Sequence, residues 1–183
     1  YTPPFTGSTT TNVGDKLAQY LTVQDFDGAD FSVKLQAAID ALPSDGGVIY
    51  ADSITGDQVV SQQILINKPI TLYLGSYTLT VGSGVTSPAI KVTRPARIVG
   101  SVSSRFVDVS STTRGFYGTN LVSGSGYSGY LIGVQNVSPY DQFNAAMTQI
   151  ENMSIDGNAK AASGVLVEGL SLIHISEPTR PER

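Results

Sequence analysis

The stretch NKPITLYLGS (residues 67–76) is echoed further along the chain by TRPARIVGS (residues 93–101). Both run from a basic residue and a proline through a short apolar strand to Gly-Ser, and Pro69 and Pro95 are 26 residues apart. A repeat of about twenty to thirty residues made of short strands is typical of a solenoid, whose turns stack on one shared apolar core. A looser third copy is ENMSIDGN (residues 151–158). We therefore predict a stacked β-solenoid.

One amphipathic helix precedes the repeats, in DFSVKLQAAIDAL (residues 30–42). Its apolar residues recur at helical spacing, Asp30 is a suitable N-cap, and Pro43 ends the pattern. After residue 46 the helical period disappears, and short apolar runs alternate with Gly, Ser, Asn and Pro. We expect a mostly β protein whose helix covers one end of the solenoid.

Composition excludes several classes of function. The formal net charge of −4 gives no general basic footprint, so we expect no nucleic-acid partner. The chain has no cysteine, which excludes disulfides and thiolate metal sites. No apolar run approaches the roughly 18 residues of a membrane-spanning helix, so no membrane span is predicted.

The beginning of the chain resembles a known family. VQDFDGAD (residues 23–30), the helix, PSDGGVIY (residues 43–50) and ILINKPITLYLG (residues 64–75) are similar to the start of pectate-lyase-like right-handed parallel β-helix proteins. The resemblance covers residues 21–169 and implies an all-β right-handed parallel β-helix with an N-terminal capping helix and three to four coils. The acidic segment DFDGADFS is shorter than in that family, and we interpret its aspartates as turn and cap formers.

Both ends of the chain carry further resemblances. The segment up to residue 26 is similar to the connector before the β-helix of bacteriophage tailspikes, so residues 1–20 are expected to form a connector, and a tailspike would be a homotrimer. LSLIHISEPTR (residues 170–180) resembles a translated sequencing adapter. We therefore expect residues 170–183 to be a non-native tail and the solenoid to be truncated near residue 169.

The adapter resemblance removes His174, the only histidine, from the functional residues. Without it, the remaining chain offers no Ser-His-Asp triad, Cys-His pair or imidazole zinc site. Polysaccharide cleavage needs none of these, because hydrolases use two carboxylates and lyases use a cation or arginine beside a uronate.

The family resemblance implies the N-terminal part of an extracellular or virion-associated polysaccharide-degrading enzyme, a glycoside hydrolase or polysaccharide lyase. Its catalytic acids are expected beyond residue 169. A lyase would add Ca²⁺; otherwise no cofactor is expected. The alternative is a non-catalytic β-helix that serves as an adhesin, fibre shaft or carbohydrate-binding module.

Strand alternation supplies candidate polysaccharide-binding residues. If the even-numbered residues of ITLYL (residues 70–74) point inward, Thr71 and Tyr73 point outward. Alignment of the three copies predicts two outward rows, Thr71–Arg97–Ser154 and Tyr73–Val99–Asp156. The candidates for sugar contacts are therefore Tyr73, Arg97 and Asp156. Simpler interpretations stay open: Asp156 as a turn former before Gly157, Arg97 as a solvated residue, and Tyr73 as a residue covered by a neighbouring chain or loop.

Overall fold

The computed structural model describes residues 14, 17–101, 118–135, 145, 147–159 and 163–168. Most of the predicted connector, much of the Gly- and Ser-rich stretch between residues 105 and 149, and the expected adapter-derived tail (residues 170–183) lie outside the described residues. The predictions made for those segments stay predictions.

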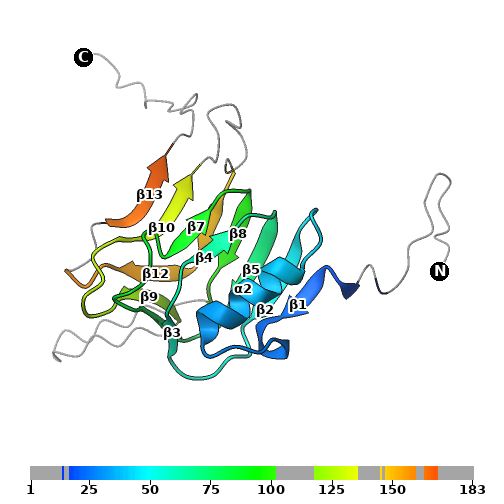
Figure 1. Cartoon of the computed structure of the whole chain (residues 1–183), viewed down its shortest axis with the longest axis horizontal. Helices are drawn as coiled ribbons and strands as arrows, with labels where there is room; N and C mark the ends of the chain where they lie inside the picture. Colours follow the sequence, from blue (N-terminus) through cyan, green and yellow to red (C-terminus); the bar gives the residue numbers. More distant parts are fainter. Residues whose placement is uncertain are drawn as a thin grey trace, which may run out of the picture.

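Three parallel sheets form the framework of the described chain (Figure 1). Sheet A has the order β1 (Tyr20–Thr22), β2 (Gly47–Ala51), β5 (Ile70–Leu74), β8 (Ala96–Val99) and β11 (Gln149–Glu151). Sheet B has the order β12 (Met153–Asp156), β9 (Thr119–Ser123), β6 (Thr78–Val81) and β3 (Gln58–Val60). Sheet C has the order β13 (Ser163–Glu168), β10 (Tyr130–Gln135), β7 (Ile90–Val92) and β4 (Ile64–Ile66).

The chain visits the sheets in a fixed order. From β2 onward, successive strands belong to sheets A, B and C in turn, and each strand pairs in parallel with the strand three places later. The two clear sequence repeats become neighbours, because Ile70 lies opposite Ala96 and Tyr73 opposite Val99. The predicted β-rich chain of short strands is confirmed, although β3 and β11 were not predicted.

The core consists of inward side chains that stack from strand to strand. In sheet A, Leu72 lies between Ile49 and Ile98, and all three side chains are buried. The other two sheets repeat this arrangement with Leu79 beside Leu121 and Ile64 beside Ile90. Because parallel pairing keeps these positions in register, the apolar columns are continuous and the alternate residues face outward.

The predicted helix is present as α2 (Phe31–Ala41), which follows the 3₁₀ turn η1 (Val23–Asp25). The Asp30 carboxylate accepts hydrogen bonds from the backbone N–H groups of Ser32 (2.8 Å) and Val33 (3.2 Å), as an N-cap does. Burial raises the pKa of Asp30, but the hydrogen bonds from Ser32, Ser61 and Val33 outweigh it and lower the pKa overall.

Side chains fasten α2 to the first strands of sheets B and C, against which it packs. The Gln36 carboxamide pairs with the backbone of Leu65 in β4 as a neighbouring strand would. Its Oε1 accepts a hydrogen bond from the Leu65 N–H (2.8 Å), and its Nε2 donates one to the Leu65 carbonyl (3.3 Å). Ser32 Oγ accepts from the backbone of Ser61 (3.0 Å). The Lys68 ammonium donates to the Ile39 (3.0 Å), Asp40 (2.8 Å) and Leu42 (2.5 Å) carbonyls at the end of the helix. Through Gln36 and Ser32, the helix thereby satisfies backbone groups at sheet edges that would otherwise be unpaired.

A Gln36→Ala substitution tests this edge cap. We expect a loss of about 1–2 kcal/mol in the free energy of unfolding, because the Leu65 N–H and carbonyl lose their partner. We also expect faster hydrogen exchange at the Leu65 amide, measured by NMR. Gln62→Ala is the matched control, because the Gln62 side chain is exposed and lies only three residues before Leu65. Equal effects of the two substitutions on Leu65 exchange would contradict this role.

Candidate functional site

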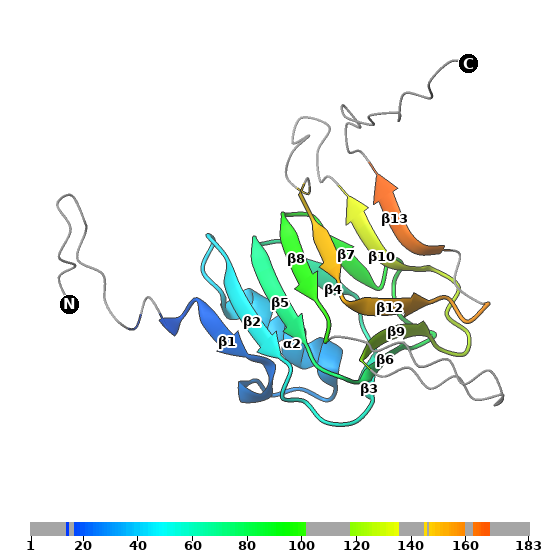
Figure 2. The ribbon, with the colours of Figure 1, turned by 180° about the vertical axis from the view of Figure 1, so that it is seen from behind.

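The outward side chains of sheet A form the candidate site, which we call the outer face of sheet A. Figure 2 shows β1, β2, β5 and β8 side by side. One row across this face reads Val48, Thr71, Arg97 and Gln149, and the next row reads Tyr50, Tyr73, Val99 and Glu151. Aromatic residues therefore lie toward one end of the face and charged residues toward the other.

Tyr50 and Tyr73 stack on one another across β2 and β5. Their ring centroids are 5.4 Å apart and their planes differ by 11°. Both rings are half-buried, so each shields one face of the other. The next residue of the row is the smaller, non-aromatic Val99, so the stack of rings ends at Tyr73.

Arg97 and Glu151 form a two-point ion pair on adjacent strands. Arg97 Nε donates to Glu151 Oε1 (2.9 Å), and Arg97 Nη2 donates to Oε2 (3.0 Å). These hydrogen bonds raise the pKa of Arg97 and lower the pKa of the Glu151 carboxyl. The Arg97 side chain stays 46% exposed, so the pair orients the guanidinium without covering it.

The predicted third row member is wrong. Tyr73 and Arg97 lie on the outer face of sheet A as expected, but Asp156 is the last residue of β12 in sheet B, and Ser154 lies in the same strand. The Asp156 carboxylate accepts a hydrogen bond from the Asn158 N–H (2.7 Å), which is the turn-forming role left open above. The pairing of β8 with β11 puts Gln149 and Glu151 in the rows instead.

Sequence reasoning missed Glu151 and Tyr50. A signal for Glu151 existed: Asn152 follows β11 as Gly100 follows β8, and its φ of 55° is one that Asn tolerates better than most residues. Aligning Asn152 with Gly100 would have placed Glu151 opposite Val99. Tyr50 required only that the strand GVIYA be added to the same alignment.

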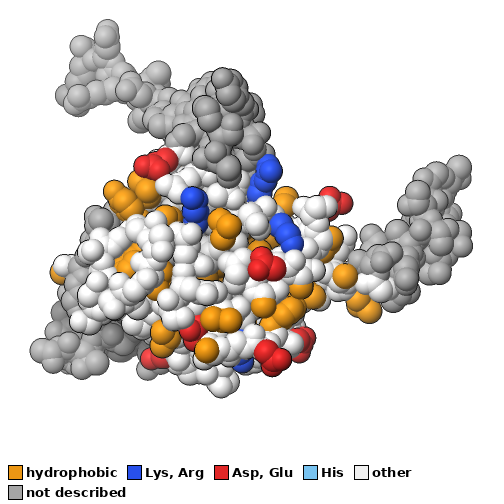
Figure 3. Space-filling view, viewed as in Figure 1, with side chains coloured by type: hydrophobic (Ala, Val, Ile, Leu, Met, Phe, Trp, Pro, Cys, Tyr) orange, Lys and Arg blue, Asp and Glu red, His pale blue; other side chains and the backbone are white. Residues whose placement is uncertain are grey.

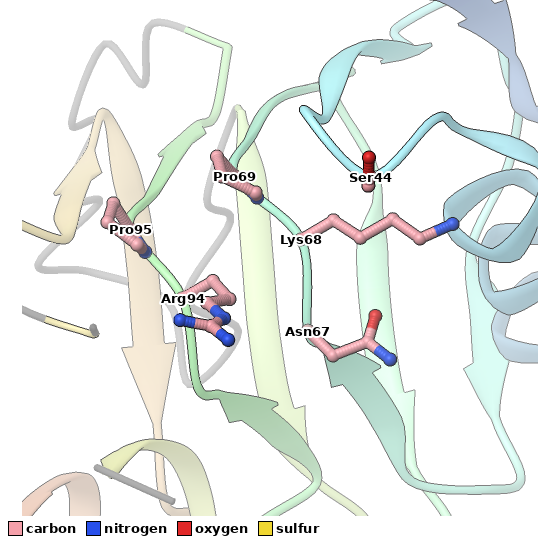
Figure 4. Close-up of a pocket in the computed structure, with 6 residues that line it drawn as sticks. All are labelled: Ser44, Asn67, Lys68, Pro69, Arg94 and Pro95. Atoms are coloured by element: carbon pink, nitrogen blue, oxygen red, sulfur yellow. The ribbon is translucent and has the colours of Figure 1, made fainter. Parts of the chain in front are cut away.

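Two hollows lie where the chain passes from sheet C to sheet A. The larger, which we call the corner pocket, has a volume of about 580 Å³ (Figure 4) and is lined by Ser44, Asn67, Lys68, Pro69, Arg94 and Pro95. The smaller, about 280 Å³, shares Pro69 and Pro95 with it and reaches Thr71, Arg97 and Met147. The two hollows therefore share two lining residues, and the smaller one also reaches Thr71 and Arg97 of the outer face of sheet A.

Among the described residues, no group of three or more His, Cys, Asp or Glu side chains is placed to hold a metal ion. That part of the chain also contains no helix both long and apolar enough to cross a membrane. No protein-family model matches the sequence, and neither the curated proteins nor the solved structures give a match.

Proposed function

We propose that this chain binds an acidic polysaccharide on the outer face of sheet A. The observation that supports this proposal is the arrangement of the stacked Tyr50 and Tyr73 rings near exposed Arg97, which Glu151 holds in a fixed orientation. Flat aromatic rings offer apolar surface to the C–H groups of a sugar, and arginine recognises carboxylates through paired N–H donors. We further propose that the three sheets are the faces of a right-handed parallel β-helix.

Arg97 retains the donors that this role needs. The guanidinium carries five N–H groups, and Glu151 uses one on Nε and one on Nη2. The edge formed by Nη1 and Nη2 is still available for a second carboxylate. Glu151 is thus a positioning residue, which reduces the conformational freedom that Arg97 would lose when it binds a uronate.

The geometry favours binding over cleavage on this face. A general base works best when its pKa lies near the operating pH, whereas the contact with Arg97 lowers the pKa of Glu151. Hydrolysis requires two carboxylates, and Glu151 is the one carboxylate in the two described rows of this face. A role as a carbohydrate-binding module or shaft is therefore the better supported form of the proposal.

Polysaccharide degradation, by a glycoside hydrolase or by a lyase with Ca²⁺, is the second form, which rests on the family resemblance described above. An extracellular or virion-associated location belongs to both forms of the proposal and rests on the same family resemblance. In the tailspike version of this proposal, in which the complete protein is a bacteriophage tailspike, three copies of the protein form a homotrimer.

Binding of a galacturonate oligomer to the full chain, measured by isothermal titration calorimetry, tests the proposal. We expect Tyr73→Ala and Arg97→Ala each to weaken binding about three- to tenfold. The expected effects are modest because both contacts are partly exposed to solvent. Glu151→Gln should weaken binding less than Arg97→Ala, since the guanidinium remains.

Lys34→Ala is the matched control, because it removes a positive charge from α2, which packs mainly on β3, β4 and η1. It should leave the affinity unchanged. Circular dichroism and thermal unfolding would establish that each variant is folded. Folded Tyr73→Ala and Arg97→Ala variants with the affinity of the unaltered chain would refute the proposed binding face.

A further inference from the structure

Strands β11, β12 and β13 form the last layer of the three sheets, which we call the end layer. They pair with β8, β9 and β10 of the preceding layer, and each is the outermost described strand of its sheet. β13 lies at the opposite end of the stack from α2 (Figures 1 and 2). Within the described part of the chain, the end layer is therefore supported on one side only, whereas β5 and β8 are paired on both sides.

The apolar columns of the core lose their cover in the end layer. In sheet C, Ile132 and Val134 are buried, but Val165 and Val167, which lie opposite them, are 39% and 54% exposed. Figure 3 shows hydrophobic side chains at the surface over β13, at the upper left of the view. A residue of the end layer therefore contributes less burial to stability than its partner in the preceding layer.

The packing between the sheets is also incomplete at this end. Ile150 of sheet A and Ile155 of sheet B continue the core columns, but both are only partly buried. Ile150, Val165 and Val167 line a hollow of about 200 Å³. Loose packing and low burial reduce the free energy that keeps one part of a protein closed. The end layer should therefore open more readily than the strands beneath it.

The backbone is strained at the corners of the end layer. Four described residues other than glycine have a positive φ, of 48° to 66°, and all lie beside β11 or β12: Met147, Asn152, Asn158 and Ala159. Asparagine tolerates this left-handed conformation, but methionine and alanine meet a steric penalty in it. Met147 is also 87% exposed, so little packing offsets its penalty. This strain lowers the cost of opening the end layer.

Arg97 and Glu151 join the end layer to the preceding layer. Arg97 belongs to β8 and Glu151 to β11, and their two hydrogen bonds (2.9 and 3.0 Å) connect strands whose pairing covers only three residues. The two side chains are 46% and 35% exposed. Salt weakens an ion pair in that setting, because mobile ions screen charges that face solvent. The contact is therefore sensitive to ionic strength.

Sheets B and C have side-chain contacts of their own between the two layers. Asn158 Nδ2, in the turn after β12, donates to the Ser123 carbonyl of β9 (3.3 Å). Gln135 Nε2, in β10, donates to the Glu168 carboxylate of β13 (2.5 Å). Each of these contacts includes one charged group at most, whereas the contact of Arg97 with Glu151 joins two. Salt should therefore act mainly through the ion pair.

We propose that the end layer is a detachable unit, which opens while α2 and the inner layers stay folded, and that the Arg97–Glu151 ion pair is its salt-sensitive latch. This inference goes beyond the proposed function, because it gives Glu151 a part in a conformational change. Opening separates the end layer from the preceding layer and uncovers side chains that are otherwise buried: Ile98, Leu121 and Ile132. Free strand edges beside apolar side chains form a surface to which a strand of another protein can add.

Native-state hydrogen exchange of the full chain, followed by mass spectrometry of its peptides, tests whether the end layer is a unit. After correction for intrinsic exchange rates, we expect peptides from β11, β12 and β13 to exchange at least about tenfold faster than peptides from β5 and β6. A unit that opens as a whole gives the same protection in its three strands. Fraying from one end would instead give protection that rises stepwise from β13 back to β11.

Charge variants and salt test the latch. At low ionic strength, Arg97→Gln and Glu151→Gln should each speed exchange in the end layer about two- to fivefold. The double variant should do no more, because each single variant already removes the pair. About 0.5 M NaCl should speed exchange similarly in the unaltered chain and leave the variants unchanged.

Lys34→Gln is the charge-matched control for Arg97→Gln, because it removes a positive charge from α2. It should exchange as the unaltered chain does. Exchange in β5 and β6 should be the same in all of these proteins, which would show that the inner layers stay folded.

Two results would overturn the inference. Equal protection in the end layer and in β5 and β6, or a stepwise rise from β13 to β11, would show that the end layer is not a separate unit. An end layer that opens as a unit but responds neither to salt nor to the folded Arg97→Gln and Glu151→Gln variants would show that the ion pair is not its latch. Neither measurement includes a ligand, so the proposed function is tested separately by the galacturonate titration.

Discussion

A Leu72→Ala substitution is expected to lower the free energy of unfolding by about 3 kcal/mol or more. Leu72 is 1% exposed and lies in the central strand of sheet A, between the fully buried side chains of Ile49 and Ile98. Removing most of a buried leucine side chain loses its transfer free energy and leaves a cavity, and such substitutions cost about 2–5 kcal/mol. The parallel register holds both neighbours, so the cavity cannot close easily.

Thr71→Ala is the matched control for this prediction. Thr71 precedes Leu72 in β5, but its side chain points to the outer face and is half-buried. We expect its loss to change stability by less than about 1 kcal/mol. Urea unfolding followed by circular dichroism measures the stability of both variants. An unchanged dependence of the free energy of unfolding on urea concentration would show that the unfolding transitions are comparable. Similar losses for Thr71→Ala and Leu72→Ala would contradict the inward and outward assignment of β5.

The local elements of this fold were predictable because their signals lie within a few residues. The α2 helix has an N-cap at Asp30, an apolar stripe and a following proline, all readable along the chain. The first two repeats were also correct, because Pro69 and Pro95 mark equivalent corners in strongly apolar surroundings. The strands β3 and β11 were missed because QVV and QIE are only three residues long and begin with a polar residue.

The candidate site was predicted only in part, because it depends on pairing across the chain. Tyr73 and Arg97 were placed correctly by strand alternation within the clear repeats. The third copy was misaligned because the corner at Asn152 falls inside the stretch ENMSID, dividing it between sheets A and B. Nothing in the local apolar pattern marks that division, so Glu151 was replaced by Asp156 in the predicted row.

Gly46→Ala is expected to have the second large effect, a loss of about 3 kcal/mol or more in the free energy of unfolding. Gly46 has a φ of 80°, in the left-handed region that favours glycine. A Cβ atom added there would lie 1.6 Å from the Pro69 carbonyl oxygen, which also accepts the Gly47 N–H (3.1 Å). The backbone would have to move, and the pairing of β2 with β5 begins at this point.

Gly56→Ala separates the cost of a left-handed alanine from the cost of the steric contact with the Pro69 carbonyl. Gly56 has a similar φ of 76°, but an added Cβ atom there would meet no atom within 4 Å. It should therefore show only the conformational cost of a left-handed alanine, about 1 kcal/mol. The excess loss in Gly46→Ala, measured by urea unfolding, then reports the contact with Pro69, and hydrogen exchange at the Gly47 amide should increase with it. Equal losses of stability in the two variants would show that the Pro69 carbonyl does not pack against this turn. They would also contradict the close approach of Gly47 and Pro69, which line the smaller hollow together.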